Sequence, residues 1–452
     1  MVGTLVDNAR QPGDSGRSLD RQILALAVPA LGALVAEPLF VLIDSVMVGR
    51  LGTAELAGLS LSSTLLVSVV GVFVFLAYAT TAATARRIGA GDRGGAVSAG
   101  VDGMWLALGL GAVAALTLGL GAPSIVTALG AEGAVVPHAV GYLRYSAGGL
   151  PGMFLVMAAT GTLRGLLDTR TPLVVAAGGA ALNVGLNALF IYGFHLGVAG
   201  SGLGTAVAQT LMGLVLGAVV LRGARGLQVS LRPRPAGIWA SARSGLPLFV
   251  RTVTLRIAVL LTVVTATALG ATALAAHQVV NALWGLAAFA MDALAIAAQA
   301  MIGQGLGAGD GPRVRAVLRR TLQWGVGFGA VIGVVVAGGG WWLTTLFTTD
   351  PQVRTAAAVA LVVTGVAMPM AGWVFVLDGV LIGAGDGTFL AWAGVVTLVV
   401  YVPLLAAVWA WAPAGGAGLA WLWAAFAGGF MAARAVTTGL RARGDRWMVL
   451  GA

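Results

Sequence analysis

Two carboxylic acids lie within the first long apolar stretch of this chain, where ionisable groups are costly. Glu37 and Asp44 are seven residues apart, two turns of an α-helix, so both side chains would lie on one helix face. A medium of low polarity disfavours the charged form of a carboxyl group, so such a residue can bind and release a proton at physiological pH. Asp44 is the better candidate, because Glu37 precedes Pro38 and could instead bond to backbone groups freed by that proline. The alternative role for Asp44 is a fixed hydrogen bond to a neighbouring helix.

Four neutral polar residues occur at helical spacing in two later apolar stretches. Asn183 and Asn187 are one turn apart, as are Thr205 and Gln209. They could form a polar network with Asp44, or they could only join neighbouring helices by hydrogen bonds.

The second half of the chain carries different ionisable groups. We expect Asp292 to pair with Arg251 or Arg256, because an unpaired charge at membrane depth is costly. A structural pair is the expected role, and a part in substrate or proton handling is the alternative. Asp102 and Asp378 lie near the ends of apolar stretches and are expected at an interface or in loops.

Enzyme signatures are absent from the sequence. The three histidines are far apart and predict no metal site, and His277 is expected in a wet position at the start of an apolar stretch. The glycine-rich turns lack the lysine of a phosphate-binding loop. We therefore expect no enzymatic activity and no cofactor.

The composition indicates which elements must position these residues. Hydrophobic residues make up 59% of the 452 residues and charged residues only 9%, so most of the chain must lie in lipid. The net charge of +10 comes from short arginine clusters between apolar runs, which favours a membrane topology signal over nucleic-acid binding. Continuous apolar runs without alternation predict helices. Twelve spans are expected, at about residues 22–48, 56–82, 95–121, 134–160, 171–194, 198–221, 239–267, 273–303, 314–340, 352–381, 388–411 and 415–438.

The two halves of the chain repeat each other at a constant offset of 218 residues. Pro29 corresponds to Pro247, and the segment GAGD at 89–92 recurs at 307–310. A duplicated apolar chain is typical of a two-lobed transporter. The duplication does not extend to the acids, because Thr262 stands at the position of Asp44.

The arginine distribution predicts a multi-pass protein of the inner (plasma) membrane with both termini in the cytoplasm. Six spans per half give both lobes one orientation, so the pseudo-two-fold axis should run along the membrane normal. The expected segments are a disordered cytoplasmic tail (1–20), a first lobe (21–221), a cytoplasmic linker (222–238), a second lobe (239–440) and a cytoplasmic tail (441–452).

Glycine and proline indicate how the helices pack. Many of the 69 glycines lie inside spans, for example Gly329 and Gly333, which predicts that helices pack closely there. The alternative is that these glycines allow neighbouring helices to slide past one another. Pro29 lies within the first span and is expected to bend it by removing a backbone hydrogen bond.

Several segments together resemble the multidrug and toxic compound extrusion (MATE) family, and most closely its DinF-type branch. The resemblance covers about residues 20 to 440. It rests on residues 36–40 (AEPLF) with Asp44, 49–52 (GRLG), 197–201 (GVAGS), 275–278 (AAHQ), 291–295 (MDALA) and 377–386 (LDGVLIGAGD).

The resemblance implies drug export driven by inward movement of protons or sodium ions. The family's coupling acid matches Asp44, its helix-bending proline matches Pro29, and its polar partners match Asn183, Thr205 and Tyr142. The position of Asn187 is often an acid in the family. The amide here weakens the case for a two-acid sodium site and leaves coupling to Asp44, with Glu37 as the second candidate.

The sequence therefore predicts an all-α membrane protein with twelve spans in two six-helix lobes, acting as a monomer in contact with membrane lipid. Its expected function is export of small amphipathic molecules by alternating access, coupled to protons rather than sodium. The alternatives are a sodium-coupled exporter and a flippase for lipid-linked precursors, for which only Arg251 and Arg256 could supply a cationic cavity.

Overall fold

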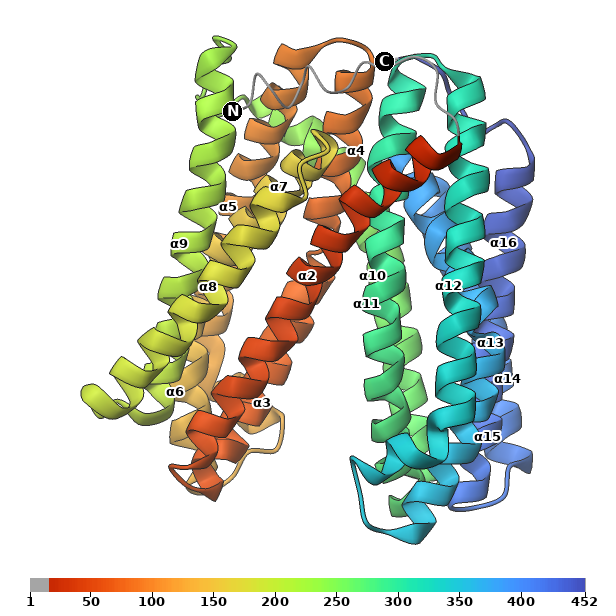
Figure 1. The fold of residues 1–452 in the computed structure, drawn as a ribbon. Coiled ribbons are helices and arrows are strands. Elements are labelled where there is room, and N and C mark those ends of the chain that lie inside the picture. Colours follow the sequence, from red (N-terminus) through yellow and green to blue (C-terminus); the bar gives the residue numbers. More distant parts are fainter. Residues whose placement is uncertain (1–15, 452) are drawn as a thin grey trace. The chain divides into compact units, whose positions relative to one another are not determined.

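The computed structural model describes residues 16–451, except for the side chains of Gly16, Arg17 and Glu37. Within this range the regular elements are helices and no strand occurs, as the apolar runs predict (Figure 1). Contacts divide the chain into two compact units. Unit 1 is Val28–Gly245, and unit 2 consists of residues 16–27 together with 246–451.

The first helix, α2 (Gly16–Gly49), contributes residues 16–27, about three turns, to unit 2 and the remainder to unit 1. In unit 2, Asp20 accepts hydrogen bonds from Arg320 at 2.6 Å and from the indole nitrogen of Trp324 at 2.8 Å. The other helical elements of unit 1 are α3 (Thr53–Val72), α4 (Phe75–Gly89), α5 (Arg93–Ala128), α6 (Val135–Ala147), α7 (Leu150–Gly165), α8 (Arg170–Ala188), the π-helix η1 (Leu189–Gly193) and α9 (Gly197–Gly226).

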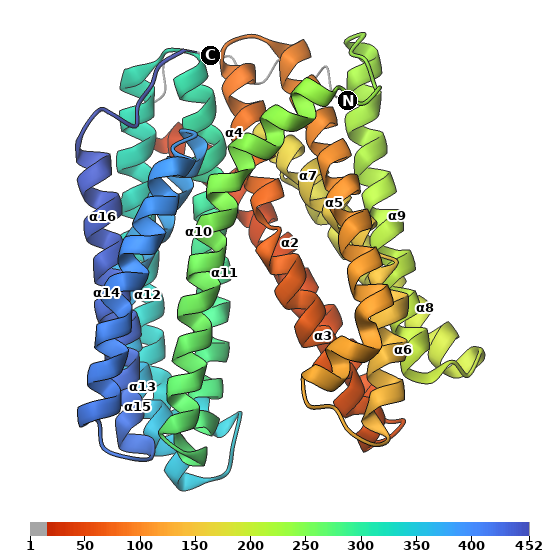
Figure 2. The same cartoon turned by 180° about the vertical axis from the view of Figure 1, so that it is seen from behind.

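Helix α10 (Pro235–Ala268) begins in unit 1 and continues into unit 2. In Figures 1 and 2 the helices of unit 2 run alongside one another. They are α11 (Ala271–Gly307), α12 (Gly311–Thr345), α13 (Pro351–Gly383), α14 (Gly387–Trp411), α15 (Gly416–Trp423), the π-helix η2 (Ala424–Phe430) and α16 (Met431–Arg443).

Eleven helical stretches among the described residues are long and apolar enough to cross a membrane. The pair α6 and α7 is bent by 47° at a short break, and counting it as one span gives twelve. The expected all-helical membrane fold is thus confirmed.

The ends of several predicted segments differ from the structure. Helix α2 begins at Gly16, so residues 16–20 are helical and not a disordered tail, while residues 1–15 lie outside the described range. Helix α9 continues to Gly226 and α10 starts at Pro235, which shortens the segment between them to 227–234. The polar residues that suggested a tail or linker are compatible with terminal helical turns.

The repeat is visible at equivalent helix starts. Asp92 accepts a hydrogen bond from the backbone nitrogen of Gly95 at 2.8 Å and caps α5. Its repeat counterpart Asp310 accepts from Arg313 at 3.0 Å and caps α12. The glycine before each aspartate has a positive φ, which a residue with a side chain rarely adopts. The motif therefore encodes a turn followed by a helix start in both halves.

One helix is central in each unit. In unit 1, α7 packs against α4, α5 and α9, and in unit 2, α13 packs against α11, α12 and α16. Backbone contact between α12 and α13 is made possible by glycines. A Cβ at Gly329 would lie 3.0 Å from the Cα of Pro369, and one at Gly325 would lie 2.7 Å from the carbonyl oxygen of Gly372. The predicted close packing is therefore present between these helices.

We expect Gly329→Ala to destabilise the protein by about 1–3 kcal/mol, because the added methyl group overlaps the α13 backbone. Gly327 lies on the same helix with open space around its would-be Cβ. Gly327→Ala is the matched control and should be neutral or stabilising by about 0.5–1 kcal/mol, since alanine favours the helix. Thermal unfolding midpoints in detergent would measure both, and equal shifts would contradict the packing argument.

Candidate functional site

Asp44 lies in α2 and is nearly enclosed in unit 1, with 5% of its surface exposed. The hydroxyl of Ser201 donates to its carboxylate, at 2.6 Å from Oδ1 and 2.8 Å from Oδ2. The side-chain amide of Asn187 donates to Oδ1 at 3.1 Å. Among the described residues no arginine or histidine forms an ion pair with Asp44. A buried carboxylate held only by neutral donors is a group that a proton or cation can neutralise.

The hydrogen bonds continue from Asp44 along α8 and into α9. Asn187 also donates to Asn183 Oδ1 at 3.2 Å, and Asn183 donates to Thr205 Oγ1 at 3.3 Å. One-turn spacing places both asparagines on one face of α8, as it does Ser201 and Thr205 on α9. The structure thus brings Asp44, Asn183, Asn187 and Thr205 into one buried network.

A cavity of about 210 Å³ lies within unit 1 beside this network. Asn183 and Thr205 line it, as do two further predicted residues, Tyr142 and Gln209. Most of the other lining side chains are apolar, among them Phe40, Val70, Met153, Met157, Met212 and Leu216. The network therefore connects the Asp44 carboxylate to the wall of an apolar cavity.

Other predicted residues of α2 stand in different positions. The side chain of Glu37 lies outside the described residues. Pro29 is buried within α2, two residues after the point where the helix passes from unit 2 to unit 1. Ser201 was not predicted as a site residue. Its position one turn before Thr205 was the signal that could have identified it.

The repeat positions of the network in unit 2 hold mostly larger and less polar side chains. Thr262 replaces Asp44, Tyr401 replaces Asn183 and Trp423 replaces Thr205. The hydroxyls of Thr262 and Tyr401 are hydrogen bonded to each other at 2.7 Å, whereas in unit 1 Asp44 is linked to Asn183 through Asn187. Tyr401 packs against Phe426 and Phe430, with ring centroids 6.1 and 5.1 Å away. The same scaffold thus holds a carboxylate network in unit 1 and an aromatic cluster in unit 2.

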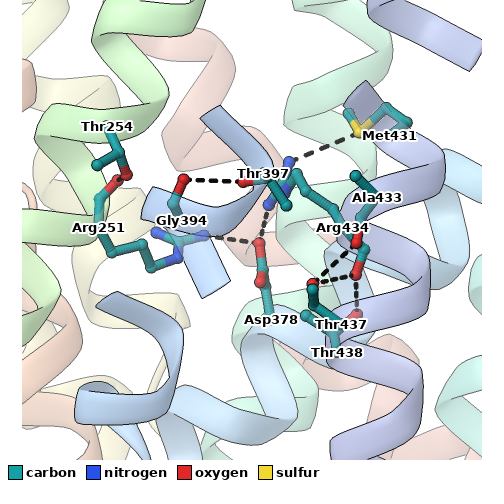
Figure 3. Close-up of polar contacts among 10 residues, drawn as sticks. All are labelled: Arg251, Thr254, Asp378, Gly394, Thr397, Met431, Ala433, Arg434, Thr437 and Thr438. Atoms are coloured by element: carbon teal, nitrogen blue, oxygen red, sulfur yellow. Dashed lines mark hydrogen bonds and ion pairs between the residues drawn. The ribbon is translucent and has the colours of Figure 1, made fainter. Parts of the chain in front are cut away.

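The buried charges of unit 2 gather around Asp378 instead. Arg251 of α10 donates to Asp378 Oδ2 at 2.7 Å, and Arg434 of α16 donates to the same oxygen (Figure 3). In Figure 3 both guanidinium groups point toward this carboxylate, and Arg434 also contacts the sulfur of Met431 at 3.6 Å. This arrangement joins three helices, α10, α13 and α16.

The placement of Asp378 rules out the loop position that was one of its two expected locations, and the interface position stays a prediction. It is a helical residue with 6% of its surface exposed. Asp102 was misplaced in the same way: it is buried in α5, and Arg234 donates to its Oδ1 at 3.2 Å. In both cases the arginine partner comes from a helix or linker far along the chain, which sequence spacing does not show.

The other charges of unit 2 are less clearly paired. The charge of Asp292 acts electrostatically on Arg434. The expected pairing of Asp292 with Arg256 is not found among the described residues, whereas its pairing with Arg251 stays a prediction. The side chain of Arg256 is exposed and makes no ion pair within the described part of the chain.

Comparison with known proteins decides the family. The MatE family model matches residues 29–189 and again residues 247–407, so the second match begins and ends 218 residues after the first. The chain belongs to the MatE family. MatE proteins are transporters, which confirms that this chain is a multi-pass membrane transporter and not an enzyme.

Curated relatives of this MatE protein include bacterial and plant members. DNA damage-inducible protein F of Escherichia coli is 28% identical over 82% of both chains. Protein DETOXIFICATION 44, chloroplastic, of Arabidopsis thaliana is 29% identical over 86% of this chain and 77% of its own length. The DinF-type resemblance is therefore confirmed.

Solved structures share the fold at lower identity. A MATE transporter in the bent conformation has a TM-score of 0.86 at 22% identity, covering 98% of this chain and 97% of that one. The Vibrio cholerae MATE transporter VcmN in the bent form has a TM-score of 0.85, also at 22% identity, over 96% of this MatE chain and 99% of its own.

Proposed function

We propose that this MatE protein is a proton-coupled antiporter that exports small amphipathic molecules by alternating access, with Asp44 as the residue that carries the proton. The observation that supports this most strongly is the buried Asp44 carboxylate, which is hydrogen bonded to Ser201 and Asn187 and paired with no cation among the described residues. Neutralising it by a proton removes the cost of a buried negative charge.

The neutral partners suit a group that must lose and regain a proton. Both donate hydrogen bonds to the charged carboxylate. Asn187 Oδ1 is buried and has no partner among the described residues, so it is available as an acceptor. Once Asp44 is protonated, its hydroxyl group needs an acceptor, and reorientation of the Asn187 amide would supply one. An acid at position 187 would add a second negative charge, and the amide avoids it.

The connection to the cavity supports coupling of proton to substrate. A change at Asp44 alters the hydrogen bonds of Asn187, then Asn183, and then Thr205 at the cavity wall. The largely apolar lining with a few polar groups suits an amphipathic drug or metabolite. The names of the plant DETOXIFICATION relatives are consistent with such substrates.

The remaining features of the proposal follow from charge distribution and family. We place the protein in the inner (plasma) membrane with both termini cytoplasmic, because the arginine clusters fall on the side of the termini. We further propose that it acts as a monomer. Sodium coupling is the alternative. It is less favoured because the amide of Asn187 stands where a second carboxylate would be needed for a two-acid sodium site.

The test is dye efflux from proteoliposomes with a pH gradient and a sodium gradient imposed separately. We expect the pH gradient alone to drive efflux, and the sodium gradient to do so no better than a matched potassium gradient. If a sodium gradient drives efflux at constant pH, sodium and not the proton is the coupling ion. Efflux indifferent to both gradients would refute ion coupling.

A further inference from the structure

A histidine in unit 2 has both ring nitrogens buried without a hydrogen-bond partner. His277, in the second turn of α11, has 2% of its surface exposed, so its predicted wet position is wrong. Neither Nδ1 nor Nε2 has a partner among the residues that the structure describes. The proposed transport mechanism assigns this side chain no role.

A second unpartnered group lies beside it. Trp423, the last residue of α15, is 1% exposed, and its indole nitrogen also lacks a partner within the described range. The rings of His277 and Trp423 are 5.6 Å apart between centroids. Trp284 and Phe426 enclose the indole, with centroids 5.9 and 5.5 Å from it. An imidazole on α11 and an indole on α15, whose nitrogens lack partners among the described residues, therefore lie side by side.

These groups complement a water molecule. A buried polar group without a partner is costly, so few persist in native proteins. A neutral imidazole offers one donor and one acceptor, and an indole offers one donor. A water oxygen can accept from the indole N–H, while a water hydrogen is donated to the unprotonated imidazole nitrogen. We propose that His277 and Trp423 form a buried binding site for a single water molecule that joins α11 to α15.

The repeat gives this site a structural role. Trp423 stands at the position of Thr205, where unit 1 links its helices through side-chain hydrogen bonds. In unit 2 the larger indole fills that position, and the water would join α15 to α11, whereas the hydrogen bond of Thr205 in unit 1 joins α9 to α8. The π-helix η2 begins directly after Trp423, at Ala424, and such segments often occur at functional positions.

The first test is a double-mutant cycle on the thermal unfolding midpoint, made with the full-length protein in detergent. His277→Leu introduces the residue found at the repeat position, Leu59, and Trp423→Phe removes the indole N–H while keeping an aromatic ring. With a bridging water, each single variant strands a polar partner and lowers the midpoint. The double variant should lose less than the sum of the two shifts.

The control cycle pairs His277→Leu with Trp284→Phe, which removes a neighbouring indole that is not among the unpartnered buried groups. Its two shifts should add. A rise in the midpoint of His277→Leu would show that the imidazole is only a dry, unpaired group and would overturn the proposal. Additive shifts in the His277–Trp423 cycle would do the same.

Nuclear magnetic resonance gives a readout that does not depend on stability. The chain has three histidines, so ¹⁵N-histidine labelling gives few signals, and His277→Leu assigns the one of interest. We expect Trp423→Phe to shift the imidazole ¹⁵N signals of His277 and Trp284→Phe to leave them in place. An unprotonated His277 nitrogen that resonates as free of hydrogen bonds in the unmodified protein would overturn the water site.

Discussion

Replacing Asp44 with asparagine is expected to abolish proton-coupled export while leaving the protein folded. The amide has the same shape and can still accept a hydrogen bond from Ser201, but it cannot bind and release a proton. Substrate-driven proton movement into proteoliposomes should fall to the level of vesicles without protein. Substrate binding should persist, because Asp44 is not among the residues that line the cavity.

The matched control is Asp445→Asn, which makes the same chemical change at an exposed carboxylate paired with Arg315. It should leave coupling unchanged. If Asp44→Asn retains full proton coupling, Asp44 is not the coupling residue, and Glu37 becomes the remaining acid of the first span to examine.

The largest effect on folding is expected from Asp378→Ala. Removing this carboxylate leaves Arg251 and Arg434 as two buried positive charges close together, without the group that neutralises them. Breaking a buried ion pair in this way costs about 3–5 kcal/mol. The yield of monodisperse protein and the thermal midpoint should both fall sharply.

Asp386→Ala provides the comparison. Asp386 lies just beyond α13 and pairs with Arg441 of α16 at 2.6 Å, but its side chain is only partly buried. Its loss should cost at most about 1 kcal/mol. An Asp378→Ala protein as stable as Asp386→Ala, yet inactive in transport, would show that the Asp378 cluster serves transport rather than folding.

Properties carried by single stretches of sequence were predictable. The lengths of the apolar stretches predicted where the membrane spans lie. Charged residues are scarce within these stretches, which identified Asp44 as a candidate site residue. Helical spacing then grouped Asn183 with Asn187 and Thr205 with Gln209, because residues one turn apart share a face. The offset of 218 residues anticipated the duplicated turns at Asp92 and Asp310.

Features that depend on contact between distant segments were not predictable. Asp378 meets Arg251 and Arg434 only because α10, α13 and α16 converge, and no local pattern indicates this. His277 was placed in a wet position because it begins an apolar stretch, whereas it is buried and packs against Trp423 of α15. The local sequence shows which helix a side chain belongs to, but tertiary packing decides which residue it contacts.

The glycine-lined contact between α12 and α13 has a practical consequence. Two helices whose backbones touch over several turns have no compressible side-chain layer between them, so their separation is fixed. Spectroscopic labels on the outward faces of these two helices should report one constant distance throughout a transport cycle. Such a pair would serve as an internal ruler against which displacement of any other labelled helix could be calibrated.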